Sequence, residues 1–354
     1  MKALVTGGAG FIGSHIVDRL VSNNINVVVL DNFSSGSIKN LKPAFEIAKK
    51  NNITIEIIEE NIENTSIWSN IPKTDGFFHL AAQTSVTRSA NFPKEDFSIN
   101  VNPILFILDY IKQSQVKYFL YANTAGALYG NAQEIPTSEN HPLHPESPYG
   151  ATKSFLETYL RATVFSQKAD GIFSSDVSKD NYFSWASLRL ANVYGPRQIS
   201  KGEAGVVPIF LEKFLKGQNV TIFGDGNKTR DYIFVKDVAD AFYAAFEKMQ
   251  SQCIDSAFNL GTGVETKDID LFNLLYKAAL ESGRYPEVVG SKTPKFAEVR
   301  SGEVLRAAID CSKLGQLIPL TPFGLLEGLE NTVKSFLVDF NSEDLADITP
   351  NILM

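Results

Sequence analysis

Cysteine and histidine are scarce in this chain of 354 residues, which contains two cysteines and four histidines. Two cysteines cannot build a disulfide framework or a four-ligand zinc site. We therefore expect Cys253 and Cys311 to be small, packed hydrophobic side chains in a protein of a reducing compartment.

The chain also lacks a long hydrophobic run and an excess of positive charge. No apolar stretch approaches the roughly 20 residues that a membrane-spanning helix needs. The formal net charge of −7 argues against a nucleic acid or an anionic membrane as the main partner. Because the first residues lead directly into a strand and a glycine loop, we expect no signal peptide. With 44% hydrophobic and 21% charged residues, the composition is that of a globular protein, and a cytosolic α/β enzyme is the class that remains.

Short apolar runs alternate with longer amphipathic stretches through the first half of the chain. The runs predict strands over 3–6, 26–30, 53–58, 76–81 and 116–122. Helices are expected between or after them, over 11–22, 43–50, 94–114 and 148–167. Strands that are apolar on both faces and separated by helices predict a parallel sheet covered by helices on both sides.

The second half of the chain continues this alternation less regularly. Residues 168–182 are rich in Ser, Asp and Lys, which we interpret as a surface insertion. A strand is expected over 183–190, and a turn over 224–227 separates two strand-like segments. Further helices are predicted over 206–215, 236–248, 268–282 and 323–337. Residues 283–303 form a looser stretch, and the tail over 338–354 shows no helical or strand periodicity.

A glycine-rich loop follows the first predicted strand and opens the first predicted helix. Its glycines are Gly7, Gly10 and Gly13, with one more residue in the turn than the usual dinucleotide loop. Glycine lets the backbone approach a pyrophosphate, and the helix N-terminus offers free N–H groups. Asp31 ends the second strand, where a carboxylate can bind ribose hydroxyls and would repel a 2′-phosphate. Although a tight turn also needs glycine, and Asp31 could be a turn residue, the pair predicts an NAD site.

Tyr149 and Lys153 lie four residues apart at the start of a predicted helix and therefore share one face. Ser147 and Pro148 fit the N-cap and the first helical position. Tyrosine is a weak base, but a nearby ammonium and a nicotinamide cation would stabilise its phenolate. Tyr149 could then remove a proton from a sugar or alcohol hydroxyl while a hydride leaves for the cofactor. The same spacing is common on solvated helix faces, which is the alternative interpretation. The position of this pair after the fifth strand of a dinucleotide fold favours the catalytic interpretation.

Thr124 stands just after the fifth predicted strand. Ligands of open α/β sheets bind beyond the carboxyl ends of the strands, so its hydroxyl could donate to the reacting oxygen. A turn threonine is the alternative, and the nearby Tyr149 and Lys153 motif favours the catalytic interpretation.

The chain resembles the extended short-chain dehydrogenases/reductases, and among them the NAD-dependent nucleotide-sugar epimerases of the UDP-glucose 4-epimerase type. The resemblance runs from residue 2 to about residue 337. It rests on ordered segments that include TGGAGFIGSH (6–15), LDNFSSG (30–36), NTAGALYG (123–130), SPYGATK (147–153), LRLANVYGPRQ (188–198) and FGDGNKTRDYIFVKDVADA (223–241). So many matches in the same order argue against chance.

The resemblance implies a Rossmann-type, doubly wound parallel sheet with a smaller, mixed α/β C-terminal substrate domain. We expect an NAD-binding domain over 1–190 with the polar insertion near 168–182. A nucleotide-sugar-binding domain over 191–337, partly interleaved with the first, and a tail over 338–354 would follow. The resemblance also implies a UDP-sugar substrate and a homodimer paired through the helices over 94–114 and 148–167.

Individual roles follow from the resemblance as well. Thr124, Tyr149 and Lys153 match the catalytic residues. The implied NAD contacts are Gly7, Gly10, Phe11, Ile12, Asp31, Asn32, Asn61, Ile62, Ala81, Ala82, Gln83, Asn100, Tyr149 and Lys153. The implied substrate contacts are Thr124, Asn192, Val206, Phe223, Arg230, Arg300 and Ala307. The two arginines would bind the diphosphate bidentately, whereas a surface salt bridge with Asp231 is the alternative for Arg230, and core packing is the alternative for Val206 and Phe223.

Four positions help to decide which reaction and which substrates of the family this chain shares. Asn61 stands where the family usually has aspartate, and Pro103 stands where it has glycine, early in a helix. Dehydratases of the family carry an acid after the active-site hydroxyl, and this chain has Ala125, which favours simple epimerisation. Ala307 is small at a position that decides whether a C2 N-acetyl group fits, so we expect UDP-GlcNAc and UDP-GalNAc to be accepted as well as UDP-glucose and UDP-galactose.

The implied reaction is NAD-dependent C4 epimerisation of a UDP-hexose through a transient 4-keto sugar. Another enzyme on the same scaffold, such as a uronate epimerase or a 4-keto-sugar reductase, is an alternative, and a reductase would consume NAD(P)H stoichiometrically. A non-catalytic dinucleotide-binding regulator is a third interpretation. Such regulators typically lack the tyrosine or the lysine, and both are present here.

Overall fold

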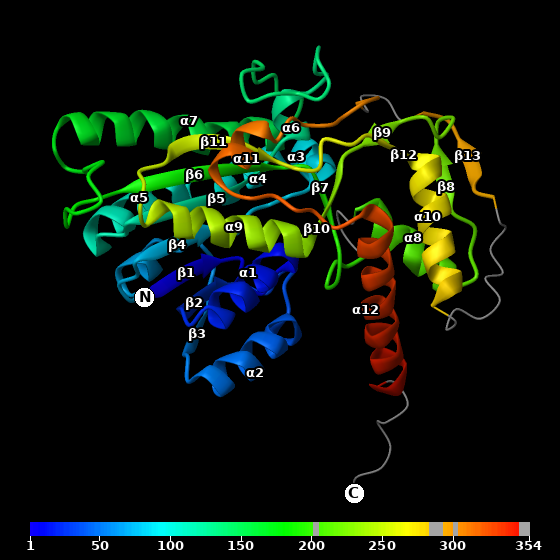
Figure 1. Ribbon diagram of the computed structural model, residues 1–354, viewed down its shortest axis with the longest axis horizontal. Helices are drawn as coiled ribbons and strands as arrows, with labels where there is room; N and C mark the ends of the chain where they lie inside the picture. Colours follow the sequence, from blue (N-terminus) through cyan, green and yellow to red (C-terminus); the bar gives the residue numbers. More distant parts are fainter. Residues whose placement is uncertain (201–204, 283–292, 300–303, 347–354) are drawn as a thin grey trace, which may run out of the picture.

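Seven parallel strands form the central sheet of the computed structural model, which describes residues 1–200, 205–282, 293–299 and 304–346 (Figure 1). The strands are β1 (Lys2–Thr6), β2 (Asn26–Asp31), β3 (Ile55–Glu59), β4 (Gly76–His79), β5 (Tyr118–Thr124), β6 (Ser184–Leu190) and β11 (Asp255–Leu260). Their order across the sheet is β11-β6-β5-β4-β1-β2-β3. The doubly wound parallel sheet is therefore confirmed. One boundary matters for the site, because β5 ends at Thr124 and not at residue 122 as predicted.

Helices cover both faces of the sheet, and alternate side chains of one strand point to opposite layers. Val27 and Val29 of β2 pack with α1 (Phe11–Ser22), α2 (Lys42–Asn51) and α9 (Val235–Met249). Val28 and Leu30 pack in the other layer, with α5 (Pro103–Ser114) and α7 (Pro148–Ala169). A strand buried on both sides needs a continuous apolar run, which is the pattern that the sequence shows.

The single helix predicted over 94–114 is wrong, because the chain forms two helices there. Helix α4 (Pro93–Asn100) follows the short α3 (Val86–Asn91), and α5 begins afresh at Pro103. Proline has no N–H to donate and its ring clashes with the preceding turn, so it is tolerated at the first helical position and interrupts a longer helix. The break separates Asn100 of α4 from the core-facing residues of α5.

A smaller unit of helices and paired strands lies beyond one end of the sheet (Figure 1). Its elements are β7 (Asn192–Tyr194), α8 (Val206–Leu215), β8 (Thr221–Phe223), β9 (Thr229–Arg230), β10 (Tyr232–Phe234), β12 (Thr266–Lys267), α10 (Asp268–Glu281) and β13 (Lys295–Ala297). Phe210, Phe214 and Phe272 are buried in its core. The turn over 224–227 separates two strands as predicted, but β8 pairs with β13 and β9 with β12.

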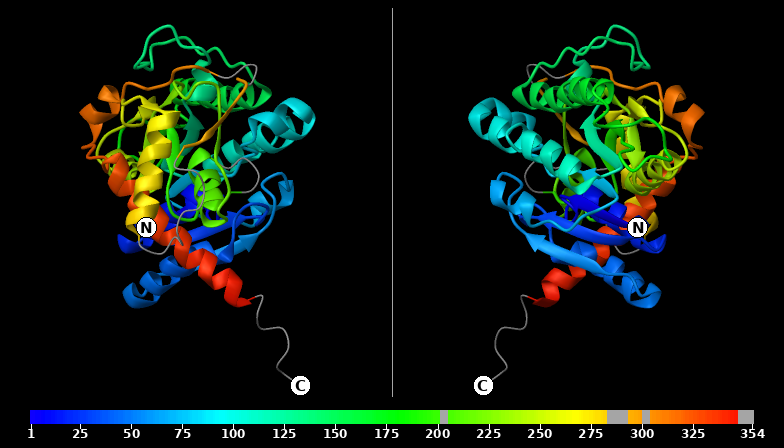
Figure 2. Two further views of the ribbon diagram at one scale, coloured as in Figure 1. Left: turned by 90° about the vertical axis from the view of Figure 1, so that its right-hand side faces the viewer. Right: turned by 90° about the vertical axis from the view of Figure 1, so that its left-hand side faces the viewer.

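Some of the later segments pack against the central sheet, and the last helix extends away from the body of the molecule. Helix α9 covers one face and β11 extends the edge beside β6, and the short α11 (Ser312–Leu317) lies near β11. Helix α12 runs over Leu325–Ala346, so the predicted end at residue 337 is wrong. Figure 2 shows the last turns of α12 reaching away from the body of the molecule. A helix segment that packs on nothing needs no apolar stripe, so the sequence of these turns gives no periodic signal.

The polar insertion is attached to the core by two aromatic side chains. Phe173 stacks on Phe183 with ring centroids 4.5 Å apart. The Tyr182 hydroxyl donates to the Met249 carbonyl at 2.8 Å. Between these anchors the residues are exposed as predicted. Most of the looser stretch predicted over 283–303 lies outside the described residues.

Asp237, in the first turn of α9, is a half-buried carboxylate that should lower the stability of the fold. Burial raises its pKa to about 6, opposed by the Phe323 N–H that donates to it, and Asp240 and Glu327 raise the pKa further. Ionisation is therefore less favourable in the folded than in the unfolded chain. That cost is complete above about pH 6 and disappears below about pH 4.

We expect Asp237→Asn to raise the free energy of unfolding near neutral pH by about 1 kcal/mol, because solvent screens a half-exposed charge. The amide oxygen can still accept from Phe323. Urea unfolding at a series of pH values measures the gain, which should vanish below about pH 4. The exposed Asp270→Asn in the first turn of α10 is the control and should give no gain. A gain for Asp237→Asn that persists at low pH would contradict the account.

Candidate active site

The glycine loop between β1 and α1 forms a backbone cradle that is packed too closely for side chains at Gly7 and Gly13. Gly7 has a φ of +69°, and a Cβ there would lie 2.8 Å from the Ala81 nitrogen. A Cβ on Gly13 would lie 2.1 Å from the Gly7 carbonyl oxygen. The Gly10 N–H donates to the same oxygen at 3.1 Å, and α1 begins at Phe11. The exposed backbone at a helix N-terminus fits a pyrophosphate, so the loop fits the dinucleotide that the sequence predicts.

Asp31 both fixes this loop and remains available to a ribose. Its buried carboxylate accepts from the Ala9 N–H at 2.9 Å and from the Phe33 N–H at 2.8 Å. Each carboxylate oxygen has a second acceptor site, so a turn-forming role and a ribose-binding role are compatible. Beside it, the Asn32 amide donates to Asn61 Oδ1 at 2.7 Å. Asn61 is thus held next to the predicted adenosine end.

The loop after β4 forms the opposite side of the cradle. Ala81 lies against Gly7, and Ala82 and Gln83 continue from it. The Gln83 N–H donates to Asn100 Oδ1 at 2.9 Å, and Asn100 Nδ2 donates to the Gln83 carbonyl at 3.0 Å. This pair of bonds fixes the backbone of the loop. Ile62 is buried in the core beneath, and its carbonyl accepts from Trp68 Nε1 at 3.0 Å.

The start of helix α7 lies against the carboxyl end of β5. Lys153 Nζ donates to the Ala122 carbonyl at 2.7 Å and lies 4.2 Å from the ring centroid of Tyr121. One turn earlier, the Tyr149 N–H donates to Ser89 Oγ of α3 at 3.1 Å. The structure therefore brings Tyr149 and Lys153 to the strand that ends at Thr124, as the sequence predicts.

The electrostatics of this site are set by burial. Burial lowers the pKa of Lys153 to about 7, and the charge of Asp96 opposes that shift. Burial, followed by the charge of Lys153, lowers the pKa of His79 to about 3, so this histidine is neutral at physiological pH. Its Nδ1 lies 2.8 Å from Thr6 Oγ1. Burial and then the nearby Tyr149 raise the pKa of Tyr121. Lys153 can thus gain or lose its proton near neutral pH.

Sequence reasoning missed a buried polar network behind β5. Glu157 accepts from Asn123 Nδ2 at 2.9 Å and from Ser187 Oγ at 2.8 Å, and it pairs with Arg189. Asn123 Oδ1 in turn accepts the Thr124 N–H at 2.9 Å. One signal could have indicated this network, because Glu157 continues the four-residue spacing of Tyr149 and Lys153 by another turn.

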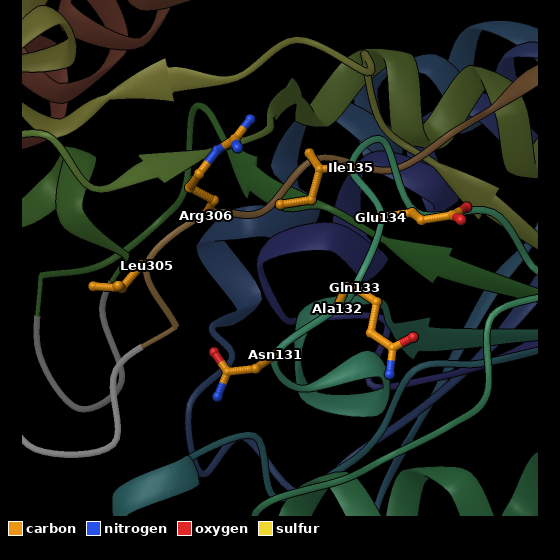
Figure 3. Close-up of a pocket in the computed structure, with 7 residues that line it drawn as sticks. All are labelled: Asn131, Ala132, Gln133, Glu134, Ile135, Leu305 and Arg306. Atoms are coloured by element: carbon orange, nitrogen blue, oxygen red, sulfur yellow. The ribbon is translucent and has the colours of Figure 1, made fainter.

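A cavity beside Thr124 combines two of the predicted substrate residues. Asn192 and Ala307 line it together with Ala125, which directly follows Thr124. A wider cavity of about 550 Å³ adjoins it and shares the lining residues Ala132 and Arg306. Figure 3 shows this wider cavity between the loop over 131–135 and the segment with Leu305 and Arg306.

The other predicted substrate residues belong to the smaller unit. Val206 begins α8, Phe223 ends β8 and Arg230 ends β9. Arg230 forms no salt bridge with Asp231, although the structure describes both residues. The Asp231 carboxylate instead accepts from the N–H groups of Thr262 and Gly263, each at 2.9 Å. Arg300 lies outside the described residues.

Two kinds of site were not found among the residues that the structure describes. None of the described helices is long and apolar enough to cross a membrane. Nor do these residues contain a cluster of His, Cys, Asp and Glu side chains that could hold a metal ion. Cys253 and Cys311 are partly buried free cysteines, and burial raises the pKa of the Cys311 thiol to about 12.

Comparison with known proteins identifies the class to which this fold and site belong. The model of the NAD dependent epimerase/dehydratase family matches residues 3–261, and the chain belongs to that family. Its cofactor is NAD. Within the family, the chain is an enzyme of the isomerase class that is similar to UDP-glucose 4-epimerases.

Three relatives show how far this similarity extends. The UDP-glucose 4-epimerase of Mycolicibacterium smegmatis is 36% identical over 337 residues, which are 95% of this chain and 98% of the relative. The crystal structure of UDP-glucose 4-epimerase from Thermotoga maritima with UDP-glucose has 38% identity and a TM-score of 0.82, covering 96% and 100% of the two chains. UDP-N-acetylglucosamine 4-epimerase from Methanobrevibacter ruminantium, in complex with UDP-N-acetylmuramic acid, has 29% identity and a TM-score of 0.80, with 96% and 98% covered.

Proposed function

We propose that this protein interconverts the C4 epimers of a UDP-hexose through a transient 4-keto sugar. The observation that carries the proposal is the placement of Tyr149 and Lys153 on one face of α7 against the end of β5, where Thr124 stands. The cradle formed by the glycine loop and Asp31 fits NAD beside them. A base, a hydrogen-bonding hydroxyl and a dinucleotide site are the components that reversible oxidation of an alcohol requires.

Each of the three residues has a distinct task in this reaction. Tyr149 removes the proton of the sugar C4 hydroxyl and later returns it. Thr124 donates a hydrogen bond to the same oxygen, and Lys153 stabilises the phenolate by its charge. Bound NAD supplies a reversible hydride acceptor. The 4-keto sugar would turn in the pocket while its nucleotide stays bound, so that the bound cofactor could return the hydride to the other face of C4.

The residue after Thr124 supports epimerisation over dehydration. Ala125 is buried and lines the cavity with Asn192 and Ala307. An elimination needs an acid or base near the leaving group, and alanine cannot supply one at this position. The resemblance to dehydratases of the same family therefore extends to the scaffold and not to this position.

The substrate that we propose is a UDP-sugar, held by its nucleotide while the sugar turns. Arg230 and Arg300 would bind the diphosphate, with Val206 and Phe223 near the base. Ala307 carries only a methyl side chain and lines a small cavity with Asn192. We therefore propose that UDP-GlcNAc and UDP-GalNAc are substrates as well as UDP-glucose and UDP-galactose. The similarity to an epimerase named for UDP-N-acetylglucosamine supports this range.

The test uses the purified protein without added cofactor, incubated separately with UDP-galactose and UDP-GalNAc. Chromatography separates the C4 epimers while the NADH absorbance band is followed. Conversion without accumulating NADH is the expected result, because the hydride is returned in each turnover. No conversion of either sugar, even with NAD supplied, would refute the 4-epimerase proposal. Net formation of NADH would instead indicate another enzyme on the same scaffold, one that oxidises the sugar without returning the hydride.

We also propose that the protein is a homodimer paired through α4, α5 and α7. Phe97, Leu105 and Phe155 are each about half exposed on these three helices, and Phe155 stacks on the partly exposed Tyr159 with ring centroids 5.4 Å apart. Apolar side chains gathered on neighbouring helices are typical of a protein–protein contact. The family resemblance implies a contact through the same helices, which supports the proposal.

Replacing both Leu105 and Phe155 with glutamate should therefore convert a dimer into a monomer. Dimerisation of this variant would bury two unpaired glutamate charges per protomer, which costs free energy and opposes association. Light scattering after gel filtration measures the mass directly. Val264→Glu, an equally exposed position in a loop away from these helices, is the control and should leave the mass unchanged. A monomeric parent protein, or a double variant that stays dimeric, would refute this interface.

A further inference from the structure

Asp96 of helix α4 is a buried carboxylate that joins three segments of the active site. Only 1% of its surface is exposed. Oδ1 accepts from Gln83 Nε2 at 2.7 Å and from Asn100 Nδ2 at 3.1 Å. Oδ2 accepts from Thr152 Oγ1 at 2.8 Å. These partners come from the loop after β4, from α4 itself and from the first turns of α7.

The donors that Asp96 binds are neutral, so none of them cancels its charge. A carboxylate buried among neutral donors acts on ionisable groups around it, because little water screens its charge. The hydrogen bond to Thr152 holds Asp96 against α7 directly beside the backbone of Lys153, and the charge of Asp96 raises the pKa of Lys153 against the effect of burial. The Asp96 carboxylate on α4 therefore stabilises the protonated form of Lys153 on α7.

Other polar groups face Lys153, and none of them replaces this charge. The Ala122 carbonyl accepts from Nζ, and the Tyr121 ring lies beneath it. His79 is buried and neutral near physiological pH. On its own helix, Lys153 has Tyr149 one turn before it and Glu157 one turn after it, and Glu157 is paired with Arg189.

We propose that Asp96 is a positioning residue for epimerisation, which keeps Lys153 protonated so that the ammonium stabilises the Tyr149 phenolate. The role is separate from the hydrogen bonds by which Asp96 fixes Gln83 and Asn100. This inference rests on the proposed function, because it assumes that Tyr149 is the base. The protonation state of Lys153 on α7 would then depend on a charge carried by α4.

Asp96→Asn tests the inference, because asparagine keeps the shape and removes the charge. Without that charge Lys153 loses its proton more readily, and Tyr149 ionises at higher pH. We expect the acidic limb of the pH profile of kcat/KM to move up by about one pH unit. Near neutral pH the rate should fall by about tenfold, and it should recover at higher pH. Bound NAD, measured after denaturation of the protein, should stay near one per chain.

Two further variants separate charge from structure. Thr152→Val removes the hydrogen bond to Asp96 and keeps the carboxylate, so its acidic limb should stay in place. Asp96→Glu keeps the charge, and its limb should lie at or below that of the parent protein even if Asp96→Asn does not fold. The inference would be overturned if the acidic limb stays in place in Asp96→Asn or moves equally in Thr152→Val. It would also be overturned if the acidic limb moves to higher pH in Asp96→Glu. A parent protein without epimerase activity would instead refute the proposed function.

Discussion

Replacing Tyr149 with phenylalanine should lower kcat for C4 epimerisation by roughly 10²–10⁴-fold, the usual contribution of a general base. The substitution removes one hydroxyl and keeps the ring, at the start of α7 where the backbone N–H is held by Ser89. The substitution removes one of the implied NAD contacts and leaves the others and the cradle around Gly7 in place, so KM for the UDP-sugar and the bound NAD should change little. Initial rates with UDP-galactose, together with NAD content, measure both.

Tyr159→Phe provides the matched control for this substitution. Tyr159 lies on the same helix, is partly exposed and stacks on Phe155. The same chemical change there should leave the rate within about twofold of the parent protein, since surface substitutions rarely perturb a distant site. A Tyr149→Phe variant that retains more than about a tenth of the parent rate would contradict the assignment of Tyr149 as the base.

Ala307→Tyr should abolish activity on UDP-GalNAc while sparing UDP-galactose. Ala307 lines the small cavity with Asn192 and Ala125, and a tyrosine ring would occupy the space that a C2 N-acetyl group requires. We expect kcat/KM for UDP-GalNAc to fall by at least about 100-fold, with a change of no more than a few-fold for UDP-galactose. The ratio of the two values is the measurement, because it cancels any general loss of active protein.

Leu305→Tyr is the control for the added ring. Leu305 is exposed and lines only the wider outer cavity (Figure 3). The ratio of the two substrates should be unchanged in this variant. If Ala307→Tyr slows both substrates equally, or if the parent protein does not act on UDP-GalNAc at all, residue 307 does not set the specificity of this enzyme.

The sheet could be predicted well because a strand that is buried on both faces needs an apolar run, and such runs are visible in the sequence. Val27 to Leu30 form an apolar run, and the structure places alternate members of it in the two core layers. Boundaries were less accurate, since they depend on single residues and on tertiary contacts. Pro103 begins a new helix inside the stretch that the sequence predicts as one helix, and the polar end of α12 gives no periodic signal.

The candidate site was predictable where it is local in sequence. Gly7, Gly10 and Gly13 share one loop, and Tyr149 and Lys153 share one helix face. Asp96 and Arg189 were not predicted, because their roles depend on contacts between distant segments. Arg189 of β6 meets Glu157 of α7, and Asp96 of α4 meets Thr152 of α7. No local pattern indicates which buried carboxylate faces which partner.

The central claim is that the hydride removed from C4 returns to the same carbon. The most direct test uses UDP-galactose with deuterium at C4 in ordinary water, followed by mass spectrometry of the UDP-glucose formed. A hydride carried by a bound cofactor does not exchange with solvent, so we predict that the product retains deuterium at C4. Loss of the deuterium to water would show that the carbon exchanges its proton with solvent, and would contradict the oxidation and return that Tyr149, Lys153 and the NAD site are proposed to support.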